Sequence, residues 1–311
     1  MDIRLKPIDQ QVIVITGASS GIGLATAAAA AEQGATLVLA ARSKDTLQEI
    51  ARQLSARGQP VLTVEADVGD RAQVDAVVAA ARSRFGRIDT WINNAGVSIY
   101  GRVDEISLEH ARRLFDTNFW GVVHGSLAAL PQLRAHGGAL INVGSEVSEA
   151  TIPLQVMYSA TKHAVKAFTD GLRMELEADE APVSVTLIQP TAVDTPYPEH
   201  AANYLDQEPK LPTPMIEPDK VAAAILDAAT SPTKDIRVGA MSKLNTTLAK
   251  LIPPLGQAMA KMQLGRQQRN EPPHTREGTL YRRGESGRIY GRGDDNAADP
   301  KKAAAANTRP A

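Results

Sequence analysis

Short runs of apolar, β-branched residues alternate along this chain with longer stretches in which apolar residues recur at helical spacing. Because most of these short runs are apolar throughout, both faces of each strand are expected to be buried, as in a parallel sheet between two helical layers. The predicted strands are 12–16, 36–40, 61–66, 90–94, 139–144, 183–188 and 236–239, and the predicted helices include 44–57, 70–85, 107–130, 156–178 and 218–230. This order predicts a single-domain α/β protein with a doubly wound parallel sheet of about seven strands and helices on both faces.

The last part of the chain differs in character from the alternating part. Residues 243–263 are predicted to form an amphipathic helix that "IPPLG" (252–256) interrupts, because proline removes a helical donor and clashes with the preceding turn. From residue 265 the chain is rich in Arg, Gly, Pro and Asn, and we predict a disordered basic tail. The predicted organisation is an N-terminal extension (1–10), the sheet domain (11–242), a helical extension (243–264) and the tail (265–311).

Composition and charge narrow the function classes. The 311 residues carry a formal net charge of −1 at pH 7, so no overall field attracts nucleic acid or an anionic membrane. Cysteine is absent, which excludes disulfides, thiolate catalysis and cysteine-bound zinc, and no metal site is predicted. The N-terminus lacks the apolar core of a signal peptide, and no run of about 18 apolar residues occurs, so we expect a cytoplasmic protein without a membrane span.

The segment "TGASSGIG" (16–23) follows the first predicted strand directly and leads into an Ala-rich helix. Glycines in such a turn let the backbone approach a pyrophosphate, and the N–H groups at the helix start face the phosphates. The spacing, G-x-x-x-G-x-G, is one residue longer than the common dinucleotide-binding spacing. Glycine also serves ordinary turns, but the strand–turn–helix context favours dinucleotide binding. The residues assigned to this site are Gly17, Ser19, Ser20, Gly21, Ile22 and Gly23.

A phenol and an amine stand four residues apart in "YSATK" (158–162), on one face of a predicted helix. Tyrosine has a pKa near 10, and lowering it by about 3 units requires roughly 4 kcal/mol of preferential phenolate stabilisation. One ammonium about 4 Å away supplies roughly that amount at an effective dielectric constant near 20. We therefore expect Tyr158 to transfer a proton and Lys162 to lower the pKa of Tyr158. Ser145 follows the predicted strand 139–144, at the ligand-binding edge of the sheet, and we expect its hydroxyl to bind the substrate oxygen. Taken alone, such a pair is typical of a half-buried ring beside a solvated amine. Ser145, taken alone, is typical of a serine in an ordinary turn.

Four motifs occur together in order: the long glycine spacing, "NNAG" (93–96), Ser145, and Tyr158 with Lys162. Over roughly residues 10–240 the chain thereby resembles the short-chain dehydrogenase/reductase family. The resemblance implies one Rossmann-type domain, a nicotinamide cofactor, hydride transfer between a carbonyl and an alcohol, and a dimer or tetramer. It also implies that Lys162 holds the nicotinamide ribose. Asn118 matches a fourth catalytic position, where an asparagine disturbs a long helix and a bound water links Lys162 to solvent.

The resemblance also assigns further cofactor contacts. It implies that Asp67 and Val68 contact the adenine, that Asn94, Ala95 and Gly96 line the adenosine, and that Val193 and Thr195 contact the nicotinamide carboxamide. An acidic residue after the second strand would repel a 2′-phosphate, but this chain has Ala41 and then Arg42. Because a guanidinium pairs well with phosphate, NADP(H) is preferred, with NAD(H) as the alternative. In the opposing interpretations, Arg42 only solvates a loop and Asp67 caps the next helix. Val193 and Thr195 lie in the loop "QPTAVDTP" (189–196), which usually begins Pro-Gly in the family. Thr191 stands in place of that glycine, and this leaves the geometry of the loop open.

The predicted function is an NADP(H)-dependent oxidoreductase, a carbonyl reductase or alcohol dehydrogenase, with Tyr158 as general acid/base. It acts on a small-molecule carbonyl or alcohol as a homo-oligomer, and no nucleic-acid partner is expected. The alternatives are a catalytically silent dinucleotide sensor and an epimerase or dehydratase on the same scaffold. Residues 197–217 are predicted to be a substrate lid, and deleting residues 265–311 is expected to leave cofactor affinity unchanged.

Overall fold

The centre of the molecule is a seven-stranded parallel sheet with the order β3-β2-β1-β4-β6-β7-β9. The computed structural model describes residues 3–56, 58–284 and 286–292. The strands are β1 (Val12–Thr16), β2 (Thr36–Ala41), β3 (Val61–Glu65), β4 (Thr90–Asn93), β6 (Gly138–Val143), β7 (Val183–Pro190) and β9 (Asp235–Val238). The strand order changes direction between β1 and β4, and doubly wound sheets bind ligands in the crevice at this point.

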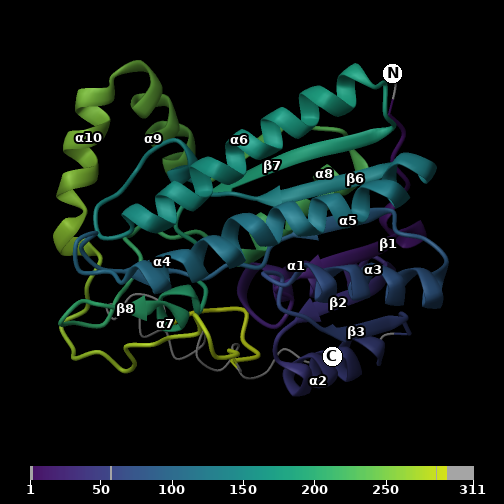
Figure 1. Cartoon of the computed structure of the whole chain (residues 1–311), viewed down its shortest axis with the longest axis horizontal. Helices are drawn as coiled ribbons and strands as arrows, with labels where there is room; N and C mark the ends of the chain where they lie inside the picture. Colours follow the sequence, from purple (N-terminus) through teal and green to yellow (C-terminus); the bar gives the residue numbers. More distant parts are fainter. Residues whose placement is uncertain (1–2, 57, 285, 293–311) are drawn as a thin grey trace.

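Helices cover both faces of the sheet, which confirms the predicted fold class (Figure 1). One layer packs through an apolar core that includes Ile13 and Ile15, and the other through a core that includes Val12 and Val14. The first layer contains α1 (Gly21–Glu32), α2 (Lys44–Ser55) and α8 (Pro218–Thr230); the second contains α3 (Arg71–Phe85), α5 (Gly121–His136) and α6 (Val156–Ala178). None of the helices in these described ranges has both the length and the apolarity that crossing a bilayer requires.

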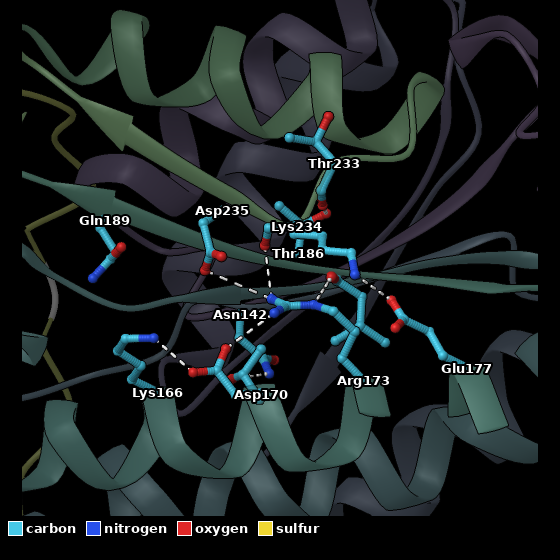
Figure 2. Close-up of polar contacts among 12 residues, drawn as sticks. Asn142, Lys166, Asp170, Arg173, Glu177, Thr186, Gln189, Thr233, Lys234 and Asp235 are labelled. Atoms are coloured by element: carbon cyan, nitrogen blue, oxygen red, sulfur yellow. Dashed lines mark hydrogen bonds and ion pairs between the residues drawn. The ribbon is translucent and has the colours of Figure 1, made fainter. Parts of the chain in front are cut away.

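A buried arginine fixes α6, which carries the predicted phenol and amine, against the sheet. Arg173 donates to the carbonyl of Val185 in β7 (3.0 Å) and to the carbonyl of Lys234 just before β9 (2.7 Å). Its guanidinium also bonds to Asp170 on α6 (3.0 Å) and lies 3.6 Å from Asp235, as Figure 2 shows. Sliding α6 along the sheet would break these bonds, so Arg173 holds the helix in register.

The predicted helix 107–130 consists of three pieces: α4 (Leu108–Phe115), a π-helical turn (Asp116–Trp120) and the start of α5. A second, two-stranded sheet was not predicted. In it, β5 (Ile99–Tyr100) pairs in parallel with β8 (Ala202–Asn203), beside the short helix α7 (Tyr197–His200). Part of the predicted lid is therefore tied to the segment that follows β4.

The region after β9 contains α9 (Ala240–Leu251) and α10 (Pro253–Met262), divided at the prolines as the sequence predicts. From residue 265 the structure departs from the predicted disorder. After the 3-10 turn Leu264–Arg266, the described residues to 292 have little regular structure but pack near α7 and β8 (yellow in Figure 1). Leu280 is 1% exposed and Gln267 is fully buried. Such docking uses backbone hydrogen bonds and few buried side chains, which composition does not reveal. The rest of the predicted tail, 293–311, lies outside the described residues.

Candidate active site

The glycine turn lies between β1 and α1, beside the crevice. A Cβ on Gly23 would lie 2.3 Å from the carbonyl oxygen of Gly17, so this approach requires glycine. Asn94 supports the turn from the end of β4 by donating to the carbonyl oxygens of Thr16 (3.0 Å) and Gly17 (3.2 Å). Of the first N–H groups of α1, that of Gly21 donates to the carbonyl of Arg288 (2.9 Å), and those of Ile22 and Gly23 have no acceptor within the helix. The turn therefore has the geometry that suits a dinucleotide pyrophosphate.

The first asparagine of "NNAG" stiffens the sheet beneath this turn. Asn93 donates to the side chains of Asn142 (2.9 Å) and Ser126 (3.1 Å) and accepts a bond from the indole of Trp91 (2.7 Å). These groups are buried, so the network fixes where β4 ends. The next three residues of the motif then line the crevice.

Arg42 lies at the end of β2, where the adenosine of a dinucleotide is expected. Its guanidinium donates to the carbonyl oxygens of Thr279 (2.6 Å) and Leu280 (3.2 Å), in the C-terminal segment. Burial lowers the pKa of Arg42, and nearby Asp67 partly opposes this. Arg42 is thus more than a solvated loop residue. Ser43, next in the chain, also lines the cleft.

Asp67 lies across the adenosine end from Arg42. Its carboxylate forms an ion pair with Arg113 and accepts a bond from the backbone N–H of Gly69 (2.9 Å). The cap of α3 is Asp70, whose side chain accepts from two N–H groups of the first turn. The interpretation of Asp67 as a helix cap is therefore wrong, and its side chain lines the cleft.

Ser145, Tyr158 and Lys162 come together in the cleft. Ser145 follows β6 and caps the 3-10 turn Glu146–Ser148. Its hydroxyl hydrogen-bonds to the phenol of Tyr158, the third residue of α6. The Lys162 Nζ lies 5.7 Å from the centroid of the Tyr158 ring. The two hydroxyls are therefore close enough to contact one substrate oxygen.

The phenol of Tyr158 is protonated at neutral pH. Burial raises the pKa of Tyr158 to about 12, although hydrogen bonds from Tyr197 and Ser145 lower it. The expected lowering by Lys162 does not prevail here, because burial is the largest influence on the pKa of this phenol. In this state Tyr158 is suited to donate a proton rather than to accept one.

Lys162 is a buried amine with a perturbed pKa. Its side chain is 5% exposed, and its Nζ donates to the carbonyl oxygen of Val143 at 2.8 Å. Burial lowers the pKa of Lys162 to about 8. Because this value lies above 7, the ammonium form still predominates at neutral pH.

Asn118 lies in the π-helical turn, which agrees with the expected disturbance of the helix. Its amide pairs with both backbone groups of Val97, accepting from the N–H and donating to the carbonyl, each at 2.9 Å. It also donates to the hydroxyl of Thr161 at 3.2 Å. Thr161 precedes Lys162 on α6, so the π-helical turn lies beside the predicted catalytic helix.

The loop after β7 contains the threonine that replaces the family's glycine. Thr191 donates to the carboxylate of Glu146 at 3.1 Å, and Asn245 of α9 donates to its other oxygen at 3.0 Å. Burial raises the pKa of Glu146, while these two bonds lower it. Val193 pairs with Ile216 in a parallel bridge and lines the cleft. Thr191 therefore ties this loop to the residue that follows Ser145.

One cleft contains nearly all the predicted site residues; Gly23 and Asn118 support it from behind. Two histidines near the motifs, His124 and His163, bond to backbone carbonyls at 3.0 and 2.9 Å, as structural residues do. The cleft also contains residues that the sequence did not single out: Ser43, Thr117, Gln155, His200, Leu211, Thr279 and Gly284. These residues belong to none of the recognised motifs, and most of them come from loops that are far from one another in the sequence.

The family model for short chain dehydrogenases matches residues 11–204. The chain belongs to the short-chain dehydrogenase/reductase family. A relative from Bacillus subtilis (strain 168), the uncharacterized oxidoreductase YxnA, is 46% identical over 279 residues, which cover 88% of this chain and 78% of the relative.

Solved structures of similar proteins, one of them a short-chain dehydrogenase/reductase, have the same fold. One from Burkholderia phymatum, in complex with NAD, is 27% identical, with a TM-score of 0.73 over 81% of this chain and 96% of that one. The L-sorbose reductase of Gluconobacter frateurii, complexed with NADPH and L-sorbose, is 29% identical, with a TM-score of 0.66 over 76% of this chain and 97% of that one. The chain thus belongs to a family of oxidoreductases, and these two solved structures contain the nicotinamide cofactors NAD and NADPH.

Proposed function

We propose that this short-chain dehydrogenase/reductase reduces a small carbonyl compound to an alcohol with NADPH. The observation that carries the proposal is the protonated phenol of the half-buried Tyr158, hydrogen-bonded to Ser145 at one end of a cleft whose other end is a glycine turn. Reduction of a carbonyl needs a proton at its oxygen, and this phenol is a proton donor at neutral pH.

The chain's own residues have distinct roles in this reaction. Ser145 donates a hydrogen bond to the carbonyl oxygen and orients it toward Tyr158. A nicotinamide cofactor held by the glycine turn and the other residues of the cleft would supply the hydride that the carbonyl carbon requires. As the C=O bond becomes a C–O single bond, Tyr158 transfers its proton to the oxygen and becomes a phenolate, which the ammonium of Lys162 stabilises.

The phenolate must then regain a proton from solvent. Lys162 lies beside the Tyr158 ring on α6, and its pKa of about 8 allows it to release a proton and regain one near neutral pH. Asn118 holds the π-helical turn against Thr161, next to Lys162, at 3.2 Å. We assign Asn118 to this relay as a positioning residue.

NADP(H) rather than NAD(H) is the proposed cofactor because the end of β2 offers the cation of Arg42 and no carboxylate. The solved relatives include one bound to NAD and one bound to NADPH, so family membership alone does not decide between them. We further propose that the enzyme is cytoplasmic and that it is a homodimer or homotetramer, the latter as the resemblance implies.

The part of the cleft beside Tyr158 combines polar and apolar walls. Glu146, Gln155 and Tyr197 provide polar atoms, and Ile152 and Leu211 provide apolar surface. The proposed substrates are therefore small ketones or aldehydes that carry both hydroxyl groups and an aliphatic part.

The test is NADPH consumption with a panel of hydroxylated and aliphatic carbonyl compounds. Tyr158→Phe should lower kcat by at least about a hundredfold, since general acid catalysis contributes that much, while the Kd for NADPH stays within about threefold. The matched control is Tyr204→Phe, because the hydroxyl of Tyr204 bonds to His110 at 2.9 Å, outside the cleft. This control should retain activity.

The alternatives give different results in the same assay. A silent sensor would bind NADPH without turnover, and Tyr158→Phe would change nothing. An epimerase or dehydratase would convert its substrate without net oxidation of NADPH. Either result would overturn the proposed reaction.

A further inference from the structure

A C-terminal segment, here called the strap (residues 275–284 and 286–292), is docked onto the backbone around β8. The N–H of Asn203 donates to the carbonyl of Arg276 (2.9 Å), and the N–H of Thr279 donates to the carbonyl of His200 (2.8 Å). Gly278 has φ +54°, and a Cβ there would lie 2.3 Å from the Ala201 carbonyl oxygen. This contact therefore requires glycine at position 278.

At the adenosine end of the cleft, the strap holds two arginines. The carbonyl of Leu280 accepts from Arg42 (3.2 Å) and from Arg113 (3.1 Å), and the carbonyl of Thr279 accepts a second bond from Arg42 (2.6 Å). The Leu280 side chain is 1% exposed and packs in a cluster that includes Val97. The strap thus fixes the guanidinium that is proposed to meet the 2′-phosphate.

Further along, the strap reaches the glycine turn. The carbonyl of Arg288 accepts from the N–H of Gly21 at 2.9 Å, and the Arg288 side chain pairs with Glu199 at 2.6 Å. Helix geometry leaves the N–H groups of Ile22 and Gly23 without intrahelical acceptors, so the strap does not use up the N–H groups that a pyrophosphate needs.

The position and charge of the strap suit an outer wall of the cofactor site. Thr279 and Gly284 line the same cleft as the glycine turn and Tyr158. Residues 275–292 contain five arginines and two glutamates. Three of these arginines form ion pairs, Arg282 with Glu277, Arg288 with Glu199 and Arg292 with Glu271, and the remaining positive charge favours an anionic dinucleotide.

We propose that the strap completes the cofactor site: it positions Arg42 and retains the dinucleotide, which leaves only when the strap detaches from residues 200–203. This rests on the proposed nicotinamide cofactor. It reverses the expectation that removal of residues 265–311 leaves cofactor affinity unchanged.

The test compares two full-length variants, Gly278→Ala and Gly265→Ala. The first adds a methyl group at the docking contact, whereas a Cβ at Gly265 has no atom within 4 Å. The rate of NADPH release is measured by stopped flow, from the loss of bound NADPH fluorescence on mixing with excess NADP+. Gly278→Ala should release NADPH about tenfold faster than the unaltered protein, as expected when one or two hydrogen bonds are lost. The release rate of Gly265→Ala should lie within twofold of that of the unaltered protein.

Thr279→Pro is the second variant, because it removes both the N–H and the hydroxyl that donate to the His200 carbonyl without adding bulk at Gly278. Release rates within twofold of the unaltered protein in both variants would overturn the role of the strap while leaving the proposed function intact. If the unaltered protein bound no NADPH, the proposed function would fail first. Faster binding without faster release would show that the strap only obstructs the cleft, which also overturns the inference.

Discussion

Replacing Lys162 by methionine should make the protein more stable and catalytically inactive. Burial lowers the pKa of Lys162 from 10.5 to about 8, and because one pKa unit corresponds to about 1.4 kcal/mol, the buried ammonium costs about 3 kcal/mol at pH 7. Methionine has a similar length and no charge, but it loses the hydrogen bond to the Val143 carbonyl, worth about 1 kcal/mol. The expected net gain in the free energy of unfolding is about 2 kcal/mol.

The lowered pKa also fixes how this gain depends on pH. Between about pH 8 and pH 10.5 the unfolded chain keeps a proton on Lys162 that the folded protein has released. The stability contributed by this site in the unaltered protein therefore rises with pH across that window. The advantage of Lys162→Met should accordingly shrink, by about 1.4 kcal/mol per pH unit above pH 8, and be largely lost by pH 9.5.

Urea unfolding at pH 7 and pH 9.5 measures both effects, and NADPH consumption measures the loss of activity. Lys166→Met is the matched control, since Lys166 lies one turn further along α6, is partly exposed and pairs with Asp170 at 2.6 Å. The Lys166→Met variant should lose less than about 1 kcal/mol of its free energy of unfolding and keep its activity. The reasoning is refuted if Lys162→Met is less stable than the unaltered protein at pH 7, or if its advantage is equal at both pH values.

Two further substitutions test the anchoring of α6 and the choice of cofactor. Arg173→Met leaves the carbonyls of Val185 and Lys234 without this donor and should lower the free energy of unfolding by about 3 kcal/mol in urea titrations; a loss below about 1 kcal/mol would contradict the anchoring role. Arg42→Ala should raise the Kd for NADPH at least about tenfold more than the Kd for NADH, measured by fluorescence titration. Equal weakening of both would show that Arg42 does not read the 2′-phosphate.

The sequence pattern predicts the sheet and its main helices closely. The bounds of β1 match the prediction, as do those of α6 and α8, because each is a clear apolar or helical run bounded by turn residues. The pairing of β5 with β8 was not predicted, since it joins two-residue strands about a hundred positions apart without a local pattern.

Site residues were predictable where a motif carries them and not where distant loops meet. Tyr158 and Lys162 stand at a helical spacing that chemistry explains, so the sequence alone places them together. Asn203 and Arg276 meet through backbone groups, which every residue has, so no residue type indicates the contact. The sequence also overestimated the effect of Lys162 on Tyr158, because it contains no information on how deeply the phenol is buried.

Two buried cations on α6, Arg173 and Lys162, differ in how many hydrogen-bond acceptors the fold gives them. The guanidinium of Arg173 meets carbonyls and carboxylates on several sides, which offsets its burial. Within the described residues, the ammonium of Lys162 has one hydrogen-bond acceptor, the Val143 carbonyl, although it carries three donors. A fold that needed only stability would gain from an apolar side chain there. The remaining N–H groups of Lys162 therefore fit a partner that the cleft receives, such as the hydroxyls of a ribose, and this ties the cost of the lysine to the proposed reaction.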